Sequence, residues 1–62
     1  MAAGLSRREH EVMVLIIQGR TSKEIARLLG LSVLTVRKHR ENLLRRIGLR
    51  STAQLIALTL GS

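Results

Sequence analysis

The chain of 62 residues contains no cysteine, no proline and no aromatic residue. Without cysteine it can form neither a disulfide framework nor a thiolate metal site. Its two histidines, His10 and His39, lie in different segments with no metal-ligand spacing around them. The core has to be built from Leu, Ile, Val, Met and Ala alone. We therefore expect no metal ion and no cofactor.

The residue patterns of common enzyme active sites are also missing. The chain has no glycine-rich phosphate loop, no paired carboxylates and no nucleophile beside a base. His39 has no acidic residue placed to orient it, so we expect it to be a half-buried packing residue rather than a catalytic base. We do not expect an enzyme.

No apolar run reaches the roughly 18 residues that a membrane-spanning helix needs. Met1 to Gly4 is too short for a signal peptide, so a cytoplasmic location is expected. Residues 1–4 are interpreted as a disordered terminus or an appended remnant. Residues 5–62 show no linker or repeat and are predicted to form one domain.

Acidic residues are scarce: four stand against eleven Lys and Arg, which leaves a net charge of +7. Such a balance favours a polyanionic partner, either nucleic acid or an anionic membrane surface. The alternative is a solvated basic surface that only keeps the domain soluble. Single-strand and RNA-binding modules usually stack bases on aromatic side chains, so the absence of aromatics favours duplex DNA.

Helical periodicity occurs four times, and each stretch begins with a capping signal. Ser6 to Glu9, Thr21 to Glu24 and Ser51 to Gln54 match the capping box, while Ser32 alone caps the third stretch. Gly19, Gly30 and Gly48 can end the first three helices. The fold class predicted is all-α, a four-helix bundle containing a helix-turn-helix. The side chains expected to face inward are Val12, Met13, Leu15, Ile16, Ile25, Leu28, Leu29, Val36, Leu43, Leu44, Ile47, Leu55, Ala57 and Leu58.

The short helix expected over residues 21–29 is joined to the helix over residues 32–47 by only a Gly30-Leu31 turn. Two helices joined this tightly, the second one basic, are typical of a DNA-reading helix-turn-helix. Six cations fall within fourteen residues and are opposed only by Glu41: Arg37, Lys38, Arg40, Arg45, Arg46 and Arg50.

Three residues on the outward side of this helix are candidates for reading bases. Arg37 can donate to guanine O6 and N7, Lys38 can reach the same acceptors or a phosphate, and Glu41 can accept from cytosine N4. The alternative is a solvated face on which Arg37 and Glu41 form an i,i+4 ion pair.

Other polar residues are candidates for phosphate contacts that set the docking register. Thr21, Ser22 and Ser32 stand at helix N-termini, where free N–H groups and the helix dipole favour phosphate oxygens. Lys23 and Arg46 add charge at the edges of the expected interface. The alternative role of the three hydroxyl residues is helix capping alone.

An ordered set of motifs runs along the chain: Leu5-Ser6-x-Arg8-Glu9-x-Glu11-Val12, Gly19, Lys23-Glu24-Ile25-Ala26, Leu31-Ser32-x-x-Thr35-Val36-x-x-His39, Asn42-Leu43 and Arg46-Ile47-Gly48. Together these motifs resemble the LuxR/GerE-type DNA-binding domain. That domain is the output module of many bacterial LuxR-type regulators and NarL/FixJ-type response regulators. The resemblance runs from about Leu5 to Leu60 and implies a four-helix domain whose third helix enters the major groove. It places base reading on Arg37, Lys38 and Glu41. It places phosphate contacts near Thr21, Ser22, Lys23, Ser32, Thr35 and Arg46.

The resemblance also implies that the fourth helix forms a two-fold dimer contact. Leu55, Ile56, Leu58 and Thr59 are the candidate residues, because this segment is too apolar for one helix face. The alternative is looser packing of the same residues on the bundle. Members usually carry an N-terminal sensory or phosphoacceptor domain, and nothing in this sequence corresponds to one.

The function predicted is therefore sequence-specific duplex-DNA binding by a bacterial transcription regulator, as a homodimer. An alternative is a module similar to region 4 of sigma factors, which docks on RNA polymerase while touching a promoter. Binding to an anionic membrane is disfavoured, since membrane-surface helices tend to be long and uninterrupted.

Overall fold

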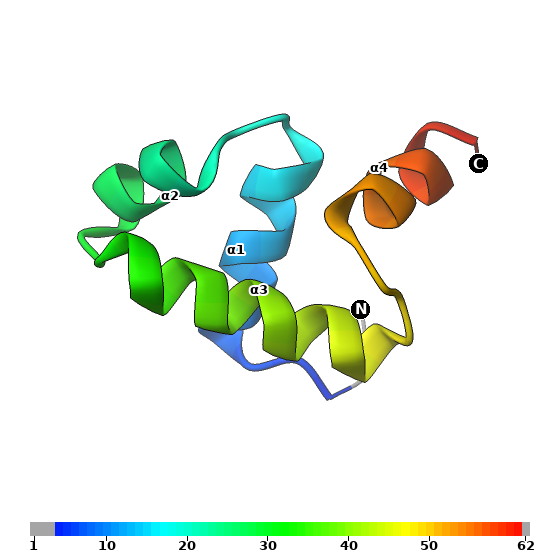
Figure 1. Cartoon of the computed structure of the whole chain (residues 1–62), viewed down its shortest axis with the longest axis horizontal. Coiled ribbons are helices and arrows are strands. Elements are labelled where there is room, and N and C mark those ends of the chain that lie inside the picture. The colour runs from blue at the N-terminus through cyan, green and yellow to red at the C-terminus, as the bar shows by residue number, and fades with distance from the viewer. Residues whose placement is uncertain (1–3, 62) are drawn as a thin grey trace.

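The computed structural model describes residues 4–61, which form four α-helices and no strand: α1 (Arg7–Ile17), α2 (Ser22–Leu29), α3 (Val33–Ile47) and α4 (Thr52–Gly61). The predicted all-α four-helix architecture is confirmed. Figure 1 shows α1 crossing α3, with α2 beside the N-terminal end of α3 and α4 near its C-terminal end. Residues 1–3, part of the predicted disordered terminus, lie outside the described residues.

Two of the predicted capping boxes start α1 and α2. The Ser6 hydroxyl accepts from the Glu9 N–H at 3.1 Å, and the Glu9 carboxylate accepts from the Ser6 N–H at 3.0 Å. Thr21 and Glu24 repeat this exchange at 3.2 and 2.9 Å. Each box satisfies N–H groups that the first turn of a helix leaves without a backbone partner.

Only one of the two hydrogen bonds of the third predicted capping box forms as expected. The Ser51 hydroxyl accepts from the Gln54 N–H at 3.3 Å, as expected, but the Gln54 side-chain oxygen accepts at 2.6 Å from the N–H of Arg50, one residue earlier. The residues that start α4 are therefore correctly predicted, while one of their two hydrogen bonds is displaced.

The turn between α2 and α3 depends on a left-handed glycine. Gly30 has a φ of 68°, and the N–H of the following Leu31 donates to the Ala26 carbonyl at 2.9 Å. Gly48 ends α3 in the same region of backbone space, with a φ of 81°. A side chain would strain the backbone at either position, because left-handed φ values are costly for residues with a Cβ.

The core lies where α1, α2 and α3 meet, and α4 adds one residue to it. Val12, Ile25, Val36 and Leu43 are at most 1% exposed. Ile16, Ala26, Leu44 and Leu55 complete the buried set. Met13, Leu15, Leu29 and Ile47 are partly buried and pack against this core, as does Leu5.

Three residues predicted to face inward do not. Leu28 and Leu58 are 57% and 61% exposed, and Ala57 is also exposed. On α2 the buried stripe follows Ile25 and Ala26, and at 3.6 residues per turn Leu28 lies about 60° from Ile25 and about 160° from Ala26, on the side away from that stripe. Leu58 is displaced similarly from the buried side of α4. The prediction was wrong there because apolar character does not determine which side of a short helix faces its neighbours.

Candidate nucleic-acid interface

Helix α3 presents a buried side and a charged outward side. Val36, Leu43 and Leu44 fix it to the core. The three candidate base-reading residues, Arg37, Lys38 and Glu41, are all exposed. Together with Leu34 they line a surface hollow of about 410 Å³. The structure thus brings all three candidates onto one accessible surface of the third helix.

Glu41 differs from the other acidic residues of the chain. Within residues 4–61, each of the remaining three is within salt-bridge distance of an arginine: Glu11 of Arg8 at 3.5 Å, Glu24 of Arg20 at 3.8 Å and Glu9 of Arg46 at 3.7 Å. No ion pair in the same range of residues joins Arg37 to Glu41. The structure therefore gives no support to the alternative in which these two residues neutralise each other.

The start of α3 carries two hydroxyl groups that were predicted to contact phosphate. The Ser32 hydroxyl accepts from the Thr35 N–H at 3.1 Å and donates to the Thr35 hydroxyl at 2.8 Å. Ser32 is exposed and Thr35 half-buried. The Ser32–Thr35 contact leaves the Thr35 hydroxyl hydrogen for an acceptor outside the pair, at the helix end that favours anions.

The N-terminus of α2 holds three further candidates. Thr21 caps the helix and is exposed, as is Lys23. The Thr21 N–H donates to the Glu24 carboxylate and is the main cause of lowering the pKa of that group, with Arg20 and Arg27 adding to the effect. Because the pKa is lower in the folded state, this cap stabilises the domain at pH values above the ordinary pKa of Glu24 and weakens as the pH falls through the lowered one.

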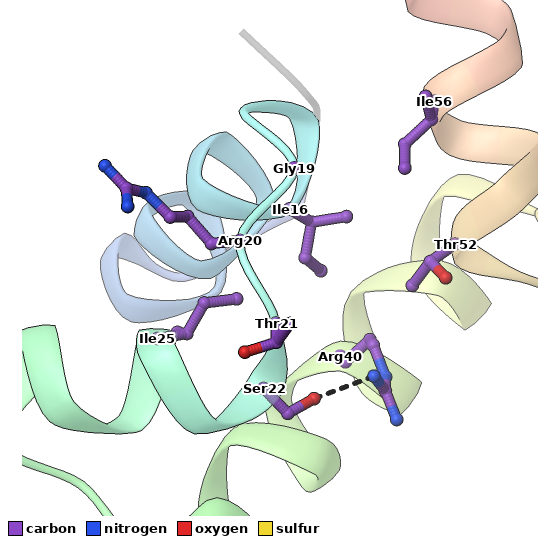
Figure 2. A pocket seen from close by; sticks show the side chains of 9 residues that line it. All are labelled: Ile16, Gly19, Arg20, Thr21, Ser22, Ile25, Arg40, Thr52 and Ile56. Carbon is purple, nitrogen blue, oxygen red and sulfur yellow. Dashed lines mark hydrogen bonds between the residues drawn. The ribbon is translucent and has the colours of Figure 1, made fainter.

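Ser22, the third candidate, is tied to α3. Arg40 donates from Nη1 to the Ser22 hydroxyl at 2.8 Å, as Figure 2 shows. Both side chains are half-buried, and they line a cavity of about 310 Å³ with Thr21 and residues of α1 and α4. Arg40 thus joins the N-terminus of α2 to α3. Sequence reasoning missed this contact because the two residues are 18 positions apart.

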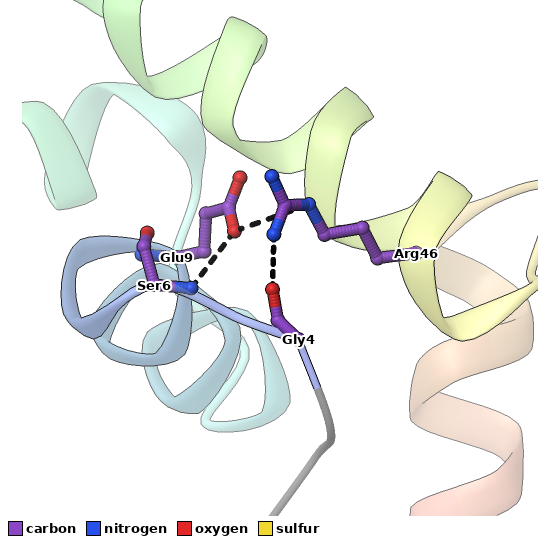
Figure 3. A network of polar contacts seen from close by, with 4 residues as sticks. All are labelled: Gly4, Ser6, Glu9 and Arg46. Atoms are coloured by element: carbon purple, nitrogen blue, oxygen red, sulfur yellow. Dashed lines mark hydrogen bonds and ion pairs between the residues drawn. The ribbon is translucent and has the colours of Figure 1, made fainter.

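Arg46, a further phosphate candidate, faces the N-terminus of α1. Its Nε lies 3.7 Å from the Glu9 carboxylate, and its Nη1 donates to the Gly4 carbonyl (Figure 3). Glu9 is only 4% exposed, whereas 53% of the Arg46 side chain is exposed. The arginine therefore compensates a buried carboxylate, a structural role that the sequence did not reveal.

The four candidate dimer residues lie at different depths on α4. Leu55 is buried in the core and Ile56 is half-buried, while Leu58 and Thr59 are exposed. The Thr59 hydroxyl donates to the Leu55 carbonyl at 3.0 Å. Leu58 and Leu60 are 61% and 81% exposed and, being two positions apart, point to different sides of α4.

Two other kinds of site are missing from the part of the chain that the structure describes. None of its helices combines the length and apolar character required to cross a bilayer. Its His and Glu side chains also form no group of three that could hold a metal ion.

Comparisons with known proteins identify the family to which the chain belongs. The sequence profile of the family described as bacterial regulatory proteins, luxR family, matches residues 3–59. The transcriptional regulatory protein TdiR of Thauera aromatica is 45% identical over 56 residues, which make up 90% of this chain and 25% of TdiR. The spore germination protein GerE of Bacillus subtilis is 40% identical over 52 residues, 84% of this chain and 70% of GerE.

A solved structure, that of the response regulator StyR, superposes with a TM-score of 0.85 at 37% sequence identity. The match covers 97% of this chain and 30% of the StyR chain. The predicted family resemblance is confirmed by the profile, by both relatives and by this superposition. The chain therefore belongs to the luxR family of bacterial regulatory proteins, as a helix-turn-helix DNA-binding domain and not as an enzyme.

Proposed function

We propose that the chain binds a specific duplex-DNA sequence by placing α3 in the major groove, as the output module of a cytoplasmic transcription regulator. One observation carries this proposal: Arg37, Lys38 and Glu41 are exposed side by side on a helix whose opposite side is anchored by the core. Because the helix is held by buried residues, its outward side chains are presented in a fixed register. Such a row can distinguish base edges rather than attract phosphate alone.

The dimensions of α3 suit this role. With side chains, a helix is about 10–12 Å across, and the major groove of B-DNA is about 12 Å wide. Arg37 is placed to donate to guanine O6 and N7, and Lys38 to the same acceptors or a phosphate. Glu41, which lacks an ion-pair partner within residues 4–61, accepts from cytosine N4.

Phosphate contacts then hold the domain on the duplex. Thr21, Ser22 and Lys23 lie at the N-terminus of α2, and Ser32 and Thr35 at that of α3, so two helix ends offer donors to the DNA backbone. Arg46 contributes at the far end of α3, where phosphate competes with Glu9 for its guanidinium group.

The salt dependence of binding tests the phosphate-driven part of this proposal. We expect the logarithm of the association constant for duplex DNA to fall linearly with the logarithm of salt concentration, with a slope of about −0.9 for each phosphate neutralised. Fluorescence anisotropy measures the affinity of the chain for a random duplex and for a duplex selected from a random pool, with anionic vesicles as competitors. Binding that does not weaken with salt, or vesicles that compete equally with the selected duplex, would contradict it.

We further propose that two copies bind a pseudo-palindromic site through the exposed side of α4. The supporting observation is that Leu58 remains uncovered in the monomer. One exposed leucine does not by itself mark an interface; the proposal rests on the dimer contact that the family resemblance implies for the fourth helix, with Leu58 as its accessible candidate.

Sedimentation at rising protein concentration, with a palindromic duplex, measures this association. We expect a complex of two chains per duplex, and we expect Leu58→Glu to reduce it to one chain. Leu28→Glu is the matched control, since Leu28 is similarly exposed, 57% against 61%, but lies on α2. A strictly 1:1 complex of the unmodified chain on a palindrome would overturn the dimer proposal.

A further inference from the structure

Leu34 occupies an unusual place for a large apolar residue. It is 77% exposed, and among the large apolar side chains described only Leu60, near the end of α4, is more exposed. Leu34 stands in the first turn of α3, and it lines the same surface hollow as Arg37, Lys38 and Glu41. The base-reading row therefore contains an apolar member that the charge pattern alone did not reveal.

The position of Leu34 on the helix keeps it in that row. Residues three, four and seven positions apart share one side of a helix, which is the spacing from Leu34 to Arg37, Lys38 and Glu41. Leu34 contributes little to the core, because most of its surface stays in water. A single exposed leucine needs no explanation by itself. Its location within a charged row beside the anchoring hydroxyls of Ser32 and Thr35 is what indicates a role.

The major groove offers one apolar group to such a side chain, the methyl group at C5 of a pyrimidine. Thymine carries it in unmodified DNA, and 5-methylcytosine carries the same group. We propose that Leu34 reads this C5 methyl group, at a base pair within two of the guanine that Arg37 contacts. The inference rests on the proposed function and names one of the bases that the site must contain.

Helix geometry limits where the methyl group lies. Leu34 and Arg37 are three residues apart, about 4.5 Å along the helix axis at a rise of about 1.5 Å per residue. Successive base pairs are about 3.4 Å apart along the duplex. The pyrimidine is therefore expected within about two base pairs of the guanine, on the side toward the N-terminus of α3.

The test begins with a duplex selected from a random pool by the unmodified chain. Each thymine is replaced in turn by deoxyuridine, which lacks only the C5 methyl group. Each guanine is replaced by 7-deazaguanine, and the position whose sensitivity is lost in Arg37→Ala is the base contacted by Arg37. At one thymine within two base pairs of that guanine, we expect the replacement to lower the affinity of the chain for the duplex about fourfold. This factor corresponds to one methyl-sized apolar contact.

Leu34→Ala should abolish this difference between thymine and deoxyuridine while retaining the sensitivity to 7-deazaguanine. Leu28→Ala, an exposed leucine on α2, should leave the difference unchanged. In a second arm, cytosine and 5-methylcytosine are compared at the same position. The unmodified chain should bind the methylated duplex more tightly, whereas Leu34→Ala should bind both duplexes equally. Thermal unfolding of Leu34→Ala should match that of the unmodified chain, so a changed preference cannot come from misfolding.

Equal binding of thymine and deoxyuridine duplexes at every position would overturn the role of Leu34, as would a methyl preference that survives in Leu34→Ala. Either result leaves the proposed function intact if a selected site exists and 7-deazaguanine weakens binding to it. A pool that yields no preferred sequence at all would overturn both proposals.

Discussion

Replacing Leu43 with alanine is expected to remove most of the folding stability of the domain. The side chain is fully buried, in one cluster with Val12, Ile25 and Val36. Truncating a buried leucine costs about 2–5 kcal/mol, because apolar contacts are lost and a cavity remains. The total stability of a chain of this size is only about 3–9 kcal/mol. No disulfide is available to compensate, since the chain has no cysteine.

Urea unfolding followed by far-ultraviolet circular dichroism measures this loss. Leu34→Ala is the matched control: it is the same substitution on the same helix, but at a residue that is 77% exposed. We expect the free energy of unfolding of Leu34→Ala to stay within about 0.5 kcal/mol of the unmodified value. Equal losses of unfolding free energy in the two variants would mean that α3 does not pack on the core through the side that carries Leu43.

Replacing Arg37 with alanine is expected to weaken binding to the selected duplex by about 1–3 kcal/mol, the range for a bidentate contact to guanine. Binding to random duplex should change much less, so the preference for the selected site should shrink. The reason is that Arg37 is exposed on the outward side of α3 and has no ion-pair partner within residues 4–61 that the substitution would release.

Lys23→Ala is the matched control for Arg37→Ala, since it removes a cation from the expected phosphate contacts. It should weaken binding to all sequences alike and reduce the magnitude of the salt slope by about 1. Affinities for selected and random duplex at several salt concentrations separate the two effects. If Arg37→Ala lowered both affinities equally, Arg37 would be a phosphate contact and the assignment of the row would be wrong.

Local signals predicted the helices well. Each capping pair is three residues apart, so Ser6 with Glu9 and Thr21 with Glu24 could be read without knowing the fold, and both boxes form. Gly30 could likewise be recognised as the residue that ends α2 and starts the turn. These features depend on backbone groups within one helical turn, which a sequence pattern specifies directly.

Features that depend on packing between helices could not be predicted in the same way. The sequence pattern did not distinguish the buried Ala26 from the exposed Leu28, since both lie in one amphipathic stretch. The contacts from Arg40 to Ser22 and from Arg46 to Glu9 join helices that are distant in sequence. For Arg46 the structure adds a second role, because the residue expected on phosphate also compensates a buried carboxylate.

The candidate site also contains features that the sequence predicted and one that it did not. That Arg37, Lys38 and Glu41 share one side of α3 follows from helical spacing, and the structure places all three on the surface. Leu34 was not singled out from the sequence, because the candidates there were chosen by charge and polarity. Its exposure in the structure identifies it as part of the outward row.

We have proposed that the outward side of α3 enters the major groove. Nuclear Overhauser contacts between the domain and a selected duplex, recorded with isotope-labelled protein, test it most directly. We expect contacts from the Leu34 methyl groups and the Arg37 side chain to major-groove protons, including a thymine methyl group or cytosine H5. Contacts confined to α1 or α4, with none from these α3 side chains, would mean that α3 does not enter the groove.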